Sequence, residues 1–153
     1  MVSRKYCFML MIGLILSIFV TDVMGENLIK YYEDQNGTIH YYKKDSINQE
    51  SGTLKVWCET RFNGKNKEWS NMVEVCKRNY ELNSIYDCNN LSYSKNLVEI
   101  NCKENIFFVP SEVLYDEDGH FIITLTNPSQ TRYVIPDTVM EELKNRVCRG
   151  TVN

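Results

Sequence analysis

The stretch that most constrains the fold of this chain is residues 96–148, where two distant cysteines lie inside strongly patterned segments. Alternation of apolar and polar side chains predicts β-strands over residues 97–102, 106–115, 120–125 and 132–135. Pro110 marks a bulge or an edge position, and Asp118-Gly119 predicts a tight hairpin turn. This part of the sequence therefore indicates antiparallel strands before a closing helix.

The closing helix has the clearest start and end signals in the chain. Thr138 and Glu141 have the spacing of a capping box, and Gly150 follows as a terminator. An apolar stripe runs along the helix through Val139, Met140, Leu143 and Val147. Cys148 flanks that stripe, so docking the stripe on the sheet would bring Cys148 near Cys102.

The first residues have the pattern of a secretory signal peptide. Arg4 and Lys5 form a short basic region, and an apolar run follows over residues 6–20. The run is shorter than the ~20 apolar residues that span a bilayer, and no positive flank follows it. We therefore expect residues 1–25 to be cleaved as a signal peptide and not retained as a transmembrane anchor.

The mature chain is then one domain, residues 26–153, in the periplasm or outside the cell. A lipid anchor is not expected, because Cys7 precedes the apolar run instead of following it. Loss of the leader changes the net charge only from −3 to −4. The chain has no basic block and no motif that reads RNA or DNA, which argues against a nucleic-acid partner. Plentiful tyrosine and sparse proline and glycine favour a compact β-rich domain.

Five cysteines remain after the leader, and in an exported protein their default state is disulfide-bonded. They are Cys58, Cys76, Cys88, Cys102 and Cys148. Five cannot all pair, and counting alone does not give the connectivity. Zinc is not expected, because the chain has no CxxC motif and both histidines lie far from any cysteine cluster.

Tyrosines flank a predicted hairpin near the start of the mature chain. Asn36-Gly37 between two β-rich runs is a strong hairpin signal, since both residues tolerate positive φ. A two-residue loop would pair Tyr32 with Tyr41, Tyr31 with Tyr42, and Lys30 with Lys43. One tyrosine pair would face inward and the other outward. We consider these four tyrosines a candidate partner-binding surface, although strands favour tyrosine anyway.

The middle of the chain predicts a strand followed by a helix. Residues 53–62 alternate with Cys58 on the core face, where it would be a buried free thiol. Residues 68–82 have helical spacing through Trp69, Met72, Val73, Cys76 and Tyr80. The chain then turns back, so Cys88 could bridge Cys76, and a Cys58–Cys76 bridge remains open as an alternative.

Several short segments, in this order and spacing, resemble the bacterial surface-adhesin protein E family. They are residues 41–47 (YYKKDSI), 55–57 (KVW), 91–94 (LSYS), 99–102 (EINC), 115–119 (YDEDG) and 135–138 (IPDT), followed by Val147-Cys148. The resemblance covers nearly the whole mature chain and implies a small antiparallel sheet with a C-terminal helix, stapled by a Cys102–Cys148 bridge. The family's name comes from a lipid-anchored outer-membrane adhesin that binds host matrix and serum proteins. This chain differs in lacking a lipid-anchor signal and in adding Cys58, Cys76 and Cys88.

Together these observations predict an α+β fold, a single antiparallel sheet of about six strands. A mid-chain helix and a C-terminal helix pack on that sheet, with disulfides at Cys76–Cys88 and Cys102–Cys148. The expected function is non-enzymatic binding of extracellular or host proteins, without a cofactor. An exported protein of another role, or a carrier of haem or a small ligand using His40, His120 or methionines, is the alternative. A secreted enzyme is less favoured, since no catalytic motif frames the histidines.

Overall fold

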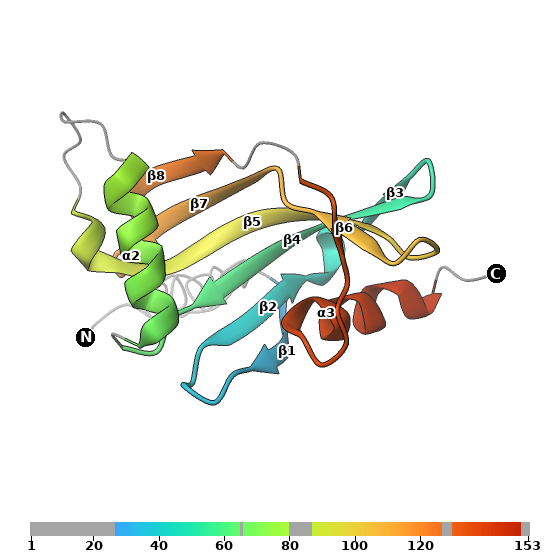
Figure 1. Ribbon diagram of the computed structural model, residues 1–153, viewed down its shortest axis with the longest axis horizontal. Helices are drawn as coiled ribbons and strands as arrows, with labels where there is room; N and C mark the ends of the chain where they lie inside the picture. The colour runs from blue at the N-terminus through green and yellow to red at the C-terminus, as the bar shows by residue number, and fades with distance from the viewer. Residues whose placement is uncertain (1–26, 65, 80–86, 127–129, 151–153) are drawn as a thin grey trace, which may run out of the picture.

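The computed structural model of the chain describes residues 27–64, 66–79, 87–126 and 130–150 (Figure 1). The expected signal peptide therefore lies outside the described residues. Six main strands form one antiparallel sheet, in which each strand pairs with the next in the order given. They are β1 (Leu28–Glu33), β2 (Ile39–Lys43), β4 (Thr53–Arg61), β5 (Leu91–Asn101), β7 (Ser111–Asp116) and β8 (Phe121–Thr126). The predicted α+β class and the six main strands are confirmed.

Three short strands extend this sheet. β3 (Asn48–Glu50) pairs with the start of β4, β6 (Ile106–Phe108) with the end of β5, and β9 (Arg132–Tyr133) with β6. The predicted strand over residues 106–115 is thus two strands, which pair with different parts of β5. Val109 and Pro110 separate them, as expected where proline cannot donate a ladder hydrogen bond.

Both helices pack on the same face of the sheet, at its opposite ends (Figure 1). Helix α2 (Lys67–Asn79) buries Val73 and Cys76 against Leu91, Leu114 and Ile122. Helix α3 (Val139–Val147) buries Leu143 and Val147 in a second cluster that includes Leu54, Val56, Val98 and Ile100. The predicted part of α2 beyond Asn79, including Tyr80, lies outside the described residues. The core is therefore two apolar clusters on one sheet, each under its own helix.

A disulfide ties each helix to the segment beside it. Cys76 of α2 bonds to Cys88 in the short 3₁₀ turn η2 (Cys88–Asn90), and Cys148 bonds to Cys102 after β5. Cys58 is free and buried, so the alternative Cys58–Cys76 bridge is not formed. Two more 3₁₀ turns, η1 (Lys44–Ser46) and η3 (Cys148–Gly150), end β2 and α3.

The capping box predicted for α3 is present, but the Glu141 carboxylate accepts from a different backbone amide than expected. The Thr138 hydroxyl accepts a hydrogen bond from the Glu141 amide at 3.4 Å. The Glu141 carboxylate accepts from the backbone amide of Asp137 at 2.8 Å, where a regular capping box would use the amide of Thr138. Asp137 has a φ of 60°, and this left-handed turn moves its amide into reach of the carboxylate.

The predicted register of the tyrosine hairpin is wrong. Observed partners are Glu33–Ile39, Tyr32–His40, Lys30–Tyr41 and Ile29–Tyr42, with a bulge at Tyr31. The loop is five residues long because the Asp34 carboxylate accepts the amides of both Asn36 and Thr38 at 2.8 Å. Gly37 still has a positive φ of 78°, as the Asn36-Gly37 signal required. The turn was placed correctly, but its length was not.

Candidate functional site

The face of the sheet opposite the helices exposes side chains from four neighbouring strands. We call it the helix-free face, since neither described helix packs on it. It presents Tyr41 of β2, Trp57, Glu59 and Arg61 of β4, Tyr93, Lys95 and Leu97 of β5, and Val113 and Tyr115 of β7. Alternation fixes this set, because Leu54, Val56 and Cys58 of the same strand β4 point into the core.

Charged side chains on this face form ion pairs within β4 and with its neighbouring strands. The Glu59 carboxylate lies 2.6 Å from Arg61 Nε and 3.6 Å from Lys95 Nζ. Lys55, also on this side of β4, lies 2.9 Å from Glu50 and 3.7 Å from Glu99. The hydrogen bond to Glu50, more than its charge, raises the pKa of Lys55. The Glu59 side chain is only 3% exposed, so its carboxylate is buried between the two cations that pair with it. The Lys55 pairs are more exposed and add little stability.

Aromatic rings lie among the paired charges. Tyr93 and Tyr115 stack across β5 and β7 with ring centroids 5.0 Å apart and ring planes 9° from parallel. The Arg61 guanidinium lies 5.1 Å from the ring centre of Tyr41, and Lys95 lies 5.8 Å from that of Tyr93. Trp57 is 43% exposed. Aromatic and arginine side chains fixed in this way are those that protein interfaces favour.

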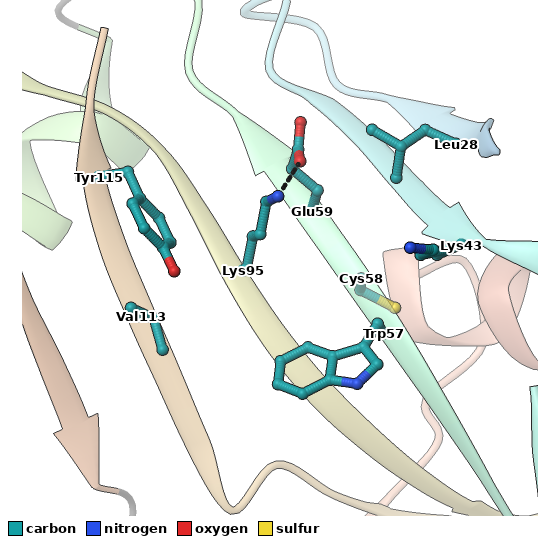
Figure 2. A pocket seen from close by; sticks show the side chains of 8 residues that line it. All are labelled: Leu28, Lys43, Trp57, Cys58, Glu59, Lys95, Val113 and Tyr115. Atoms are coloured by element: carbon teal, nitrogen blue, oxygen red, sulfur yellow. Dashed lines mark ion pairs between the residues drawn. The ribbon is translucent and has the colours of Figure 1, made fainter. Parts of the chain in front are cut away.

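A shallow cavity of about 300 Å³ opens on this face (Figure 2). Its lining consists of Leu28, Lys43, Trp57, Cys58, Glu59, Lys95, Val113 and Tyr115. Figure 2 shows the Trp57 and Tyr115 rings on either side of the Lys95–Glu59 ion pair. The cavity joins apolar surface to a paired charge, an arrangement that suits an amphipathic side chain of a partner. The described lining residues include no histidine or methionine, so none of the haem ligands considered from the sequence lies here.

The four tyrosines predicted to bind a partner do not lie on one face of the sheet. Tyr31 and Tyr42 are only 7% and 8% exposed and belong to the core under α3. Tyr32 is partly exposed and packs against the same cluster, and Tyr41 lies on the opposite, helix-free face. Burial raises the pKa of Tyr31. Of the predicted set, Tyr41 alone belongs to the helix-free face.

Sequence reasoning missed the other aromatic residues of this face. Trp57 is next to Cys58 in sequence, so alternation puts it on the opposite face of the strand, and its large apolar side chain on that face was the available signal. Tyr93 and Tyr115 meet only because β5 pairs with β7 in one register, which no local pattern specifies.

The ionisable side chains suited to catalysis are held in other contacts. Burial raises the pKa of the Cys58 thiol to about 12, so it is not a thiolate at neutral pH. His40 is buried, its Nδ1 lies 3.1 Å from Thr60 Oγ1, and burial lowers its pKa. His120 is at the β7–β8 turn, 3.1 Å from Asp116.

Asp116, Asp118 and His120 also form the group of possible metal ligands among the described residues. Their ligand atoms lie within 4.8 Å of one another. The Asp116 carboxylate already accepts the backbone amides of Asp118 and His120, at 3.0 and 2.8 Å. Although burial acts in the other direction, these hydrogen bonds lower the pKa of Asp116. These hydrogen bonds stabilise the β7–β8 turn, which explains why the three side chains lie together.

A second exposed apolar surface lies beside β9. Tyr133 and Ile135 are 75% and 63% exposed at the edge of a groove of about 450 Å³. Phe107 and Met140 line the same groove. It shares no lining residue with the helix-free face, which makes it a useful control surface. In the described part of the chain, neither helix has the length and apolar character needed to cross a membrane.

Comparison with known proteins agrees with this architecture. The sequence matches the surface-adhesin protein E family over residues 28–149, most of the chain. The chain belongs to the surface-adhesin protein E family. The match includes every described strand and helix, both disulfides and the helix-free face.

Two crystal structures of Haemophilus influenzae protein E have the same fold. One is 17% identical with a TM-score of 0.51, covering 85% of this chain and 89% of that one. The other, crystal form II, is 16% identical with a TM-score of 0.52, covering 85% and 92%. No curated protein sequence matches the chain. At this identity the structural likeness extends to the fold and not to individual contact residues.

Proposed function

We propose that this member of the surface-adhesin protein E family is an exported, non-enzymatic protein that binds an extracellular or host protein on its helix-free face. Family membership supports the general role, and the two disulfides fit an oxidising compartment outside the cytoplasm. His40 and His120 are each hydrogen-bonded to another side chain, and the Cys58 thiol is protonated. These contacts favour binding over catalysis.

The observation that carries the proposal is the exposed Trp57 ring, which lines the same cavity as Tyr115, a ring that stacks on Tyr93. Burying a tryptophan against a partner removes a large apolar area from water, and such residues dominate interface energetics. Phe121 of β8, opposite Tyr115 in the sheet and 48% exposed, extends the apolar area at the far edge. Ion pairs around the rings would set the orientation of a partner more than its affinity.

Binding of the purified protein to a panel of immobilised extracellular matrix and serum proteins tests the proposal. We expect saturable binding to at least one of them, and Trp57→Ala should weaken it at least about tenfold, since hot-spot aromatics are worth ~2 kcal/mol or more. Tyr133→Ala is the matched control, because it removes an exposed ring from the groove beside β9. Binding by folded protein to none of the panel, or loss of binding in Tyr133→Ala alone, would contradict the proposal.

A further inference from the structure

Polar side chains occupy the helix-bearing face of the sheet between the two apolar clusters. Ser94 and Asn96 lie at alternate positions of β5 and so share this face with Val98 and Ile100. Glu112 of β7 is the direct cross-strand partner of Asn96. Figure 1 shows α2 and α3 over opposite ends of the sheet, with neither helix crossing the middle of β4 and β5.

Glu68, in the first turn of α2, adds a second carboxyl group to this region. Burial raises the pKa of Glu112, and the charge of Glu68 adds to this effect. Burial also raises the pKa of Glu68, although a hydrogen bond from Thr38 acts against it. We call Glu68, Ser94, Asn96 and Glu112 the acidic strip.

The two carboxyl groups of the acidic strip have no cation paired with them in the described part of the chain. None of the ion pairs among the described residues includes Glu68 or Glu112. The N-terminus of α2 favours a negative charge at Glu68, but Glu112 is in mid-strand without such help. Carboxylates that are largely buried normally have a counter-charge. The carboxyl groups on the helix-free face all have one, which makes the acidic strip unusual within this chain.

Two further polar atoms of the strip lack partners. The Ser94 hydroxyl and Asn96 Oδ1 are buried and form no hydrogen bond of normal geometry. Ser94 is 1% exposed, and its hydroxyl can donate only a weak hydrogen bond to the Glu112 carboxylate, which favours the ionised form of Glu112. The lone pairs of Ser94 Oγ then stay open as acceptors. Buried polar side-chain atoms are hydrogen-bonded in the large majority of cases. Glu68, Asn96 and Glu112 keep part of their surface exposed, so a ligand can reach the strip from solvent.

We propose that the acidic strip binds an organic ammonium group, which donates hydrogen bonds to Asn96 Oδ1 and Ser94 Oγ while its charge pairs with Glu112 and Glu68. An ammonium carries one positive charge and three donors with no acceptor, which complements two carboxylates and two unpartnered acceptors. It can belong to a free amine or to the side chain of a lysine. The strip is on the face opposite the proposed protein-docking surface, so the two proposals succeed or fail independently.

Titration of the purified protein with butylamine and with the amide of Nα-acetyl-lysine tests the site. Calorimetry should show saturable binding of at least one amine, and no binding of butanol, which has the same length without the charge. Glu112→Gln should weaken binding at least about tenfold, as expected for loss of a hydrogen-bonded charge. Glu74→Gln, which neutralises an exposed carboxylate on the same helix α2, should leave it unchanged.

In ¹⁵N spectra of the unaltered protein, the amine should also shift the side-chain amide of Asn96 and the backbone amide of Ser94. That measurement remains informative if Glu112→Gln fails to fold. Binding of both amines identifies the ammonium alone as the recognised group, and binding of the lysine derivative alone identifies a lysine side chain as its source. No saturable binding of either amine, equal weakening in Glu74→Gln, or displacement of the amine by Ca²⁺ at lower concentration would overturn the proposal.

Discussion

His40 is an ionisable residue that the fold buries beside two aromatic rings. Its ring lies between Tyr31 and Tyr32, with ring centroids 6.1 and 5.8 Å away, and Nδ1 meets Thr60 Oγ1. Burial lowers its pKa, and the charge of Asp34 opposes this only in part. Protonating His40 in the folded state would therefore cost stability.

This burial predicts a loss of stability in mild acid. Unfolded histidine has a pKa of about 6.5, so between that value and the lower folded pKa the unfolded state binds more protons. The free energy of unfolding should fall as the pH drops from 8 through this window to 5. His40→Gln should flatten that dependence, measured by urea unfolding at a series of pH values.

His120→Gln is the control for this prediction, because it removes an exposed histidine at a turn. The raised pKa of Glu112 has the opposite effect on stability. The free energy of unfolding falls as the pH rises above about 4.3, because ionised Glu112 is less favourable in the folded state than in the unfolded state. Glu112 is present in both variants and in the unaltered protein, so its contribution cancels when their pH profiles are compared. A profile unchanged in His40→Gln, or flattened as much in His120→Gln, would show that His40 is not the residue responsible.

At the scale of elements, the β1–β2 loop shows how one side chain sets strand register. Asp34 accepts two backbone amides, and its own amide donates to Thr38 O at 3.0 Å. Asn36-Gly37 predicted that the chain turns here, but a dipeptide carries no information about how far a neighbouring carboxylate extends the loop. The bulge at Tyr31 then decides which tyrosines are buried. The four tyrosines are divided between the core and the helix-free face for this reason, while the faces of β4 followed from simple alternation.

Removing the Asp34 carboxylate should loosen this hairpin. Asp34→Ala leaves the amides of Asn36 and Thr38 without their acceptor, and we expect a loss of about 1 kcal/mol in the free energy of unfolding, typical of a lost cap. Gln35→Ala changes an exposed residue of the same loop and should cost much less. Equal losses in the two variants, measured by thermal or urea unfolding, would argue that the carboxylate has no special role.

Across the whole molecule, the sequence predicted what depends on local periodicity and capping. Helix α3, the apolar face of β4 and the buried state of Cys58 all follow from spacing within one segment. The helix-free face and the acidic strip depend on which residues of β5 meet those of β4 and β7. Such long-range register is not encoded in any single segment, so neither surface could be assembled from the sequence alone.

The two apolar clusters also predict that the molecule opens in two parts. Each cluster has its own helix and its own disulfide, and the acidic strip lies between them on the sheet. The double variant Cys102→Ser/Cys148→Ser loses a bridge that spans 46 residues, worth about 4 kcal/mol in the chain-entropy estimate. Hydrogen exchange measured by mass spectrometry should show faster exchange in α3, with α2 still protected.

The matched variant Cys76→Ser/Cys88→Ser should give the reverse pattern. Its bridge spans 12 residues, so the expected loss is smaller, about 3 kcal/mol, and faster exchange should appear in α2 while α3 stays protected. Local opening of this kind requires that the sheet remain intact when one helix detaches, which the continuous β4–β5 pairing from Thr53 to Arg61 supports. If hydrogen exchange becomes equally fast in both helices in either variant, the sheet couples the clusters into one cooperative unit. The acidic strip then does not divide the core.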